Sequence, residues 1–267
     1  MLFVRSLVFQ IVYYLNVSFW MLVWLPTMPF GRRAVMELGR QWGRTTLWWA
    51  EKICGLKHDI RGLENIPTGA MIVACKHQSV WDTFTLPIFF PDFSYILKRE
   101  LVWLPFFGWY LIAAEQIAID RSQRGKLLPQ LARKANDLFA QGRQLFIFPE
   151  GTRRKPGAKP EYKYGVAHIY SQSNVPVVPA AVNVGLFWPR RGFLIRPGTA
   201  VLEFLPPIAP GLSPREFLDL LQERIEAASN RLLDEAAAKD EALAKILAAN
   251  RAAAREEEAL AGSPRGE

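Results

Sequence analysis

A histidine and an aspartate five positions apart, His77 and Asp82, are the strongest candidates for chemistry in this sequence. They follow a short apolar run, Met71–Cys75, which is typical of a buried strand, and α/β folds commonly place reactive groups in loops at strand ends. Because a five-residue offset does not put two side chains on one face of a helix, we expect His77 in the loop and Asp82 in the first turn of the next helix. The carboxylate then fixes the imidazole tautomer and leaves the other ring nitrogen as a general base.

A second polar loop follows the apolar run 144–148. Proline and glycine fix a tight turn there, and we expect this turn to aim the carboxylate of Glu150 into the crevice that His77 faces. Further cations after the turn extend the loop into a basic surface. The candidate binding residues of this loop are Glu150, Gly151, Thr152 and Arg153.

Cations also follow two other predicted strands. Lys98 follows the run 94–97, and Arg121 follows the run 116–119. The carboxyl ends of parallel strands meet at one edge of a sheet, so we expect these cations to gather near the histidine. Arginine offers paired hydrogen bonds to phosphate and lysine offers a point charge, so the group suits a phosphomonoester.

Ser79 is the candidate nucleophile for a hydrolase. It lies two residues after His77, without the flanking glycines that expose a hydrolase serine, and a turn-capping hydroxyl is the more common role. A base without a protein nucleophile suits a substrate that brings its own hydroxyl. The alternative is a hydrolase that uses Ser79 as its nucleophile, which would lose its activity on Ser79→Ala.

Four short blocks in order, from residue 76 to about residue 180, resemble the glycerolipid acyltransferases that carry an HxxxxD motif. Bacterial 1-acylglycerol-3-phosphate acyltransferases are the most similar members. Two features depart from the family pattern: Lys76 stands where many members have asparagine, and the second block begins Ile117-Ala118 rather than with phenylalanine. The blocks are His77-Gln-Ser-Val-Trp-Asp82, Ile119-Asp120-Arg121, Phe148-Pro-Glu-Gly-Thr152 and Val175-Pro-Val-Val-Pro179.

The resemblance implies an enzyme of phospholipid biosynthesis. It would move a fatty acyl chain from acyl-CoA or acyl carrier protein to the sn-2 hydroxyl of lysophosphatidic acid, giving phosphatidic acid, and it would need no cofactor. His77 would be the base and Asp82 would orient it. Another lyso-lipid acceptor, such as a lyso-ornithine lipid, is an alternative because related members use the same core machinery. The residues that would hold the glycerol phosphate are Lys98, Arg121, Glu150, Gly151, Thr152 and Arg153.

The elements that must position these residues alternate between strand and helix. Short apolar runs predict strands, and apolar residues at helical spacing predict helices at 127–140 and 164–171. This alternation indicates an α/β domain with a mixed, largely parallel sheet flanked by helices. The aromatic stretch 101–114 predicts either a wall of an acyl-chain cavity near the bilayer surface or plain core packing. The other predicted strands are 57–61 at a sheet edge, 177–184 and 200–204.

The amino-terminal segment is uncharged from residue 6 to residue 25, long enough to cross about 30 Å of hydrocarbon as a helix. No small-residue cleavage site follows before Pro26, so we expect the segment to stay on the protein. Residues 32–55 mix arginine with tryptophan, as membrane interfaces do. We predict a membrane-attached helical hairpin, with one leaflet slightly favoured over a full span, rather than two buried helices of a soluble core. The expected location is the inner membrane, with the active site facing the cytoplasm.

The carboxyl-terminal segment opens with a helix start signal, Ser213-Pro-Arg-Glu216, which combines a capping box with a proline at the first helical position. We predict a helix with one apolar face on the body, then a solvated helix and a flexible tail. The predicted organisation is membrane-attachment helices at 1–55, an α/β acyltransferase domain at 56–212 and this segment at 213–267.

Composition and charge limit the remaining function classes. The chain of 267 residues is 50% hydrophobic, which excludes a disordered or collagen-like protein. Its 2 cysteines and 3 histidines form no spaced zinc motif, so we expect a reduced compartment and no metal site. The net charge of +8 attracts anionic lipid, a phosphorylated substrate or nucleic acid. A non-catalytic basic membrane or nucleic-acid binder is the alternative from another class. It leaves the His77 and Glu150 loops unexplained, and we expect no nucleic-acid partner.

Overall fold

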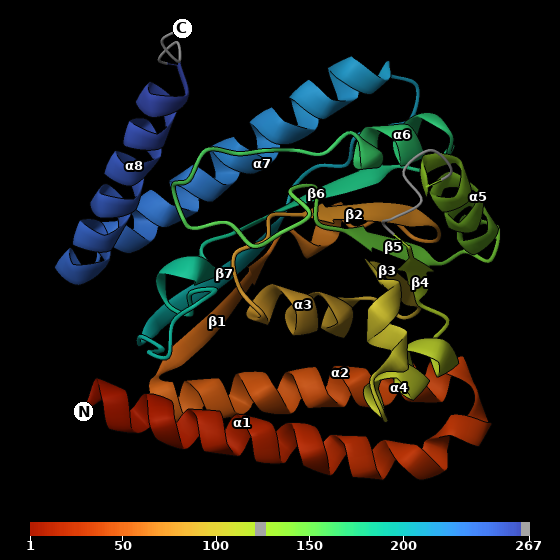
Figure 1. Cartoon of the computed structure of the whole chain (residues 1–267), viewed down its shortest axis with the longest axis horizontal. Helices are drawn as coiled ribbons and strands as arrows, with labels where there is room; N and C mark the ends of the chain where they lie inside the picture. Colours follow the sequence, from red (N-terminus) through yellow and green to blue (C-terminus); the bar gives the residue numbers. More distant parts are fainter. Residues whose placement is uncertain (121–126, 263–267) are drawn as a thin grey trace, which may run out of the picture.

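The computed structural model describes residues 1–120 and 127–262. Its centre is a seven-stranded sheet with the strand order β1-β7-β6-β2-β5-β3-β4 (Figure 1). Neighbouring strands are parallel except β6 and β7, so the predicted mixed, largely parallel sheet is confirmed. The strands are β1 (Leu56–Arg61), β2 (Met71–Cys75), β3 (Phe93–Lys98), β4 (Ile117–Ile119), β5 (Gln144–Ile147), β6 (Val177–Val182) and β7 (Gly198–Phe204).

Helices cover both faces of the sheet (Figure 1). One face carries α5, α6 and α7, and the other carries α3 and the amino-terminal hairpin of α1 and α2. The helices are α1 (Leu2–Trp24), α2 (Arg32–Trp49), α3 (Trp81–Thr85), α4 (Phe107–Ala113), α5 (Leu127–Phe139), α6 (Gly165–Ser171), α7 (Pro214–Ala237) and α8 (Glu241–Gly262).

The central strand β2 is buried along its whole length. Successive side chains of a strand point to opposite faces of the sheet. Val73 and Cys75 therefore join the hydrophobic cluster beneath the hairpin, whereas Ile72 and Ala74 join the cluster beneath α5, α6 and α7. A strand that is covered on both faces is apolar at every position, which is why this run was recognisable in the sequence.

The strands β2, β3, β4 and β5 run parallel to one another. Their carboxyl ends therefore share one edge of the sheet, as we expected for the polar loops. Three of these strands carry predicted site residues at this end: His77 follows β2, Glu150 follows β5, and Lys98 is the last residue of β3. The fourth is followed by Arg121, which lies outside the described residues.

Both helices of the hairpin contact the body: on α1, Phe9 is fully buried and its ring packs edge-on against that of Trp188. Gly43 lies directly against α3, since a Cβ atom at this position would come within 2.6 Å of the Phe84 carbonyl oxygen. The outer face of α1 is apolar and exposed, as Leu15 and Leu22 illustrate. By length and composition, α1 is the one described helix that could cross a membrane. The two predicted helices form a hairpin that packs against α3 with one face while the other stays uncovered, and its attachment to a membrane stays a prediction.

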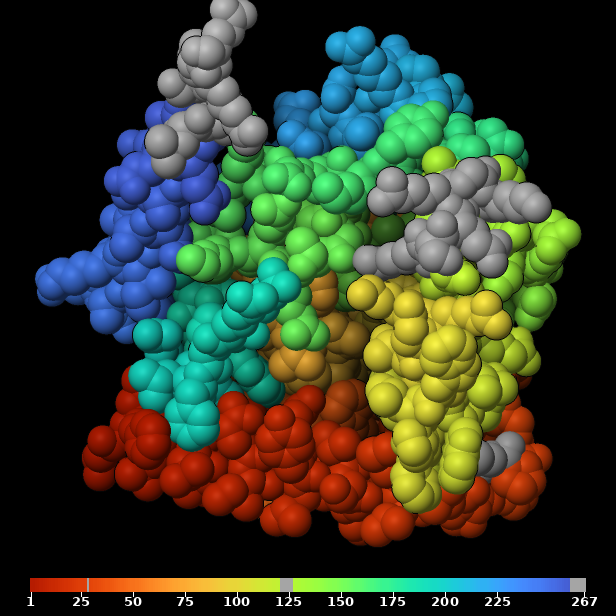
Figure 2. All heavy atoms as spheres, in the orientation of Figure 1, coloured from red at the N-terminus to blue at the C-terminus, as the bar shows by residue number. Residues whose placement is uncertain are grey.

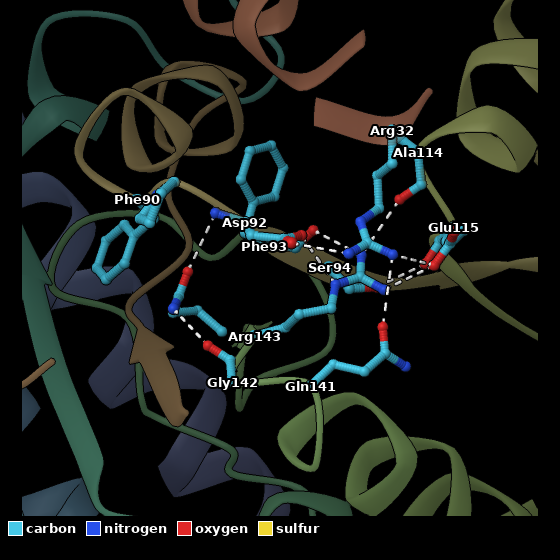
Figure 3. A network of polar contacts seen from close by, with 12 residues as sticks. Arg32, Phe90, Asp92, Phe93, Ser94, Ala114, Glu115, Gln141, Gly142 and Arg143 are labelled. Carbon is cyan, nitrogen blue, oxygen red and sulfur yellow. Dashed lines mark hydrogen bonds and ion pairs between the residues drawn. The ribbon is translucent and has the colours of Figure 1, made fainter. Parts of the chain in front are cut away.

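An ion-pair network ties the start of α2 to the sheet (Figure 3). Asp92 accepts hydrogen bonds from Arg32 and Arg143, both at 2.9 Å, and Glu115 binds the same two guanidinium groups. The side chain of Arg143 is only 3% exposed, so the network reaches into the protein. Arg32 belongs to the stretch that resembles a membrane interface in composition, but its guanidinium is bound by carboxylates of the protein.

The carboxyl-terminal segment folds as two helices. The predicted capping box is present: the Ser213 hydroxyl accepts the Glu216 amide at 3.3 Å, and the Glu216 carboxylate accepts the Ser213 amide at 3.0 Å. The predicted solvated helix is a separate one, α8, which Asp240 caps at its start. The prediction that this helix is solvated is wrong for one side of it. Leu243 and Leu247 are buried in the hydrophobic cluster because α8 packs against the body.

Candidate active site

His77 and Asp82 are in direct contact at the carboxyl end of β2. The imidazole Nδ1 lies 3.0 Å from Asp82 Oδ2. An ionised carboxylate only accepts hydrogen bonds, so Nδ1 donates and Nε2 is left as the basic nitrogen. The loop and helix placement predicted for the pair is confirmed, because Asp82 lies in the first turn of α3.

Asp82 is held in a single orientation. Its Oδ2 atom also accepts the backbone amides of Gln78 at 2.7 Å and Ser79 at 2.8 Å, and the side chain is fully buried. These two amides are therefore committed to the carboxylate and are not donors for an oxyanion. The Ser79 hydroxyl is buried and accepts the Trp81 amide, so it has the turn-capping role expected for it rather than that of a nucleophile.

Two further contacts hold His77, one on its ring and one on its backbone. Phe148 stacks on the ring of His77 with their centroids 3.8 Å apart. The backbone amide of Arg154 donates to the His77 carbonyl oxygen at 2.8 Å. Both contacts come from the loop after β5, so the two polar loops of the sequence form one site.

His77 lines a cavity of about 500 Å³ whose walls are mainly apolar. Its lining comes from both helices of the hairpin, from α3 and α4, and from the strands β3 and β5. Figure 2 shows this face of the molecule hollowed between the 95–113 region, in yellow, and the 150–163 loop, in green. Of the two interpretations of 101–114, the cavity wall is present: Leu101, Phe107 and Tyr110 line it, while Trp103 and Trp109 are exposed.

Glu150 does not point into this cavity. Its side chain is fully buried and accepts a hydrogen bond from Lys76 Nζ at 2.8 Å. The expected direction of this carboxylate is therefore wrong, because a buried ammonium draws it behind the histidine. Burial raises the pKa of Glu150 above its ordinary value, and the charge of Lys76 opposes this rise.

The other predicted binding residues are placed differently from one another. Lys98 and Gly151 line the cavity near His77, and Gly151 has φ +64°, a conformation that favours glycine. Thr152 and Arg153 follow and are partly buried. Arg153 does not line the described cavity. Its charge acts on Tyr13 of α1, where it opposes the rise in the pKa of that phenol.

Lys163, Tyr162 and Glu226 belong to the site region but were not predicted from the sequence as site residues. Lys163 lines the cavity together with Lys98, and its place in a run of cations was the available signal. Glu226 of α7 accepts Lys76 Nζ at 2.6 Å and the Tyr162 hydroxyl at 3.0 Å. No local sequence pattern indicates that Glu226 belongs to the site, because only the packing of α7 against the body brings it close to Lys76 and Tyr162.

Comparisons with known proteins place the chain among acyltransferases. A protein-family model described as Acyltransferase matches residues 57–183. The chain is similar to a 1-acyl-sn-glycerol-3-phosphate acyltransferase of Pseudomonas aeruginosa, with 38% identity over 81% of this chain and 87% of the relative. It is also similar to one of Cocos nucifera, with 32% identity over 70% of this chain and 60% of that protein.

A solved structure has the same fold. It is the crystal structure of the 1-acyl-sn-glycerophosphate (LPA) acyltransferase, PlsC, from Thermotoga maritima, with a TM-score of 0.74. The match covers 87% of this chain and 98% of that one, at 23% identity.

Proposed function

The chain belongs to the acyltransferase family, and we propose that it transfers a fatty acyl chain to the sn-2 hydroxyl of lysophosphatidic acid, giving phosphatidic acid. The observation that carries this proposal is the contact between His77, at the wall of an apolar cavity, and the buried Asp82. The relatives named 1-acyl-sn-glycerol-3-phosphate acyltransferase support this choice of acceptor.

His77 acts as the general base in this proposal. Its Nε2 atom takes the proton of the acceptor hydroxyl as the hydroxyl oxygen attacks the thioester carbonyl carbon. The tetrahedral intermediate then collapses, the carbon–sulfur bond breaks, and the leaving thiolate takes the proton from Nε2, so that the thiol departs and the imidazole is neutral again. Asp82 keeps Nδ1 protonated and stabilises the imidazolium that forms, so no covalent acyl-enzyme is needed.

The acyl donor is a thioester of coenzyme A or acyl carrier protein. Because a thiolate is a good leaving group, the site needs a strong base more than a strong acid. The apolar cavity gives the acyl chain a place out of water, and the lysines on its wall give the negatively charged headgroup a counter-charge.

A panel of lyso-lipid acceptors tests the function. We expect the purified protein to acylate lysophosphatidic acid with a higher kcat/KM than lyso-ornithine lipid, lysophosphatidylcholine or a monoacylglycerol. Thin-layer chromatography with radiolabelled acyl-CoA and acyl carrier protein measures both the acceptor and the donor preference. A preference for a lyso-lipid without phosphate would replace the proposed acceptor, and release of free fatty acid alone would favour the hydrolase.

The protein works at a membrane surface, which we propose is the cytoplasmic face of the inner membrane. The exposed apolar face of α1 and the exposed tryptophans Trp103 and Trp109 support this attachment. Since α2 packs on the body, the hairpin suits a position within one leaflet, where the cavity opens next to its lipid substrate.

Charged substitutions on the outer face of α1 should weaken membrane binding. Leu15 and Leu22 are 64% and 66% exposed, so Leu15→Glu together with Leu22→Glu leaves the core intact. We expect vesicle binding to fall about tenfold or more, because each carboxylate would have to enter the lipid. Sedimentation with anionic vesicles measures this. Leu63→Glu changes an exposed leucine outside the hairpin and is the control; equal binding by both variants would contradict the anchor.

A further inference from the structure

A buried polar cluster behind His77 takes no direct part in the proposed chemistry. It consists of Lys76, Glu150, Glu226 and Tyr162, and the Lys76 side chain at its centre is only 4% exposed. The cluster joins the end of β2, the turn after β5 and the middle of α7. These elements are far apart in the sequence, since Lys76 and Glu226 are separated by 150 positions.

The cluster reaches His77 through short covalent and polar connections. Lys76 is its neighbour in the chain, and the backbone amide of Arg154, in the loop that Glu150 begins, donates to the His77 carbonyl oxygen at 2.8 Å. Glu150 belongs to the turn closed by the Gly151 amide and the Phe148 carbonyl oxygen at 2.9 Å. Because the Phe148 ring stacks on the imidazole, a shift of this turn would move the surface against which the base rests.

Each charged side chain of the cluster is neutralised by another member of the cluster. Two carboxylates, Glu150 and Glu226, share the single ammonium of Lys76 in a place with little access to water. Burial and then the two carboxylates raise the pKa of Tyr162, so its phenol stays protonated and donates to Glu226. A buried charge without a partner is costly, so loss of the ammonium would drive the carboxylates apart.

We propose that Lys76 and Glu226 are positioning residues, through which α7 fixes the Glu150 turn and thereby the imidazole of His77. The inference rests on the proposed function, since it takes His77 as the base.

Steady-state kinetics of Glu226→Gln, Lys76→Met and the double variant test the proposal. We expect kcat to fall about fivefold for Glu226→Gln and about tenfold for Lys76→Met, with both KM values within about twofold, because a misplaced base affects the transition state rather than substrate binding. The double variant should recover part of the kcat lost in Lys76→Met, since it removes one of the two carboxylates left without a cation. Glu223→Gln makes the same chemical change at an exposed position of α7 and should leave kcat unchanged.

Melting temperatures and circular dichroism separate positioning from folding. Variants with a lower Tm but an unchanged kcat would show that the cluster only stabilises the fold, which overturns the proposal. An equal loss in Glu223→Gln would overturn it as well. If Lys76→Met fails to fold, Glu226→Gln decides alone, because glutamine keeps the shape of glutamate. The variants are compared on whichever acceptor the wild-type protein uses. A different acceptor would therefore overturn the proposed substrate and leave the positioning role standing. A wild-type protein without any transferase activity would refute the proposed function and the positioning role together.

Discussion

Replacement of His77 by alanine is expected to abolish acyl transfer while the protein stays folded. The imidazole is the one histidine ring on the described cavity wall, and its Nε2 atom is the proposed base. Loss of a general base costs about 10²–10⁴-fold in rate. The measurement is kcat with saturating lysophosphatidic acid and acyl thioester, with circular dichroism to show that the fold is retained.

Variants of two other residues sharpen this result. Asp82→Asn should also lose activity severely, because an amide does not stabilise the imidazolium and permits the wrong tautomer. His168→Ala is the control, since this histidine lies on α6 but is not among the residues that line the described cavity. A His77→Ala protein with near-normal kcat would end the assigned mechanism.

The main features of the fold were readable from local patterns. The strand Met71–Cys75 is buried on both faces and is therefore apolar at every position, and the capping box at Ser213 fixed the start of α7. The contact between His77 and Asp82 was predictable because a rigid strand end and the first helical turn leave few places for two side chains so close in sequence.

Polar contacts between segments that are far apart in the sequence could not be predicted from local patterns. The direction of Glu150 depends on Lys76 and, beyond it, on Glu226, whose position is set by how α7 packs on the sheet. Arg32 looked like a residue of the lipid interface because its ionic partner, Asp92, lies 60 residues further along the chain. Local composition identifies the charge of such residues, whereas only the tertiary fold identifies what neutralises it.

The cations at the strand ends lead to the second large expected effect, on acceptor binding. Lys98 is exposed and lines the cavity that contains His77, and Arg153 follows the turn after β5. Arg121, the third predicted member, lies outside the described residues but is tested in the same way. Lys159 is an exposed cation that pairs with Glu258 at 2.7 Å and lies against α8, so it provides a matched control.

Alanine at Lys98, Arg121 or Arg153 should raise the KM for lysophosphatidic acid about tenfold to hundredfold, because one charge-assisted hydrogen bond to phosphate is worth roughly 1.5–3 kcal/mol. The KM for the acyl thioester should change little, and a monoacylglycerol, which has no phosphate, should lose much less. Steady-state kinetics with both substrates varied measure these values beside Lys159→Ala, whose exposed ion pair is worth little. Equal, small effects in all four variants would mean that the phosphate is not bound at this edge of the sheet, and would leave the headgroup of the acceptor to be found by the lyso-lipid panel.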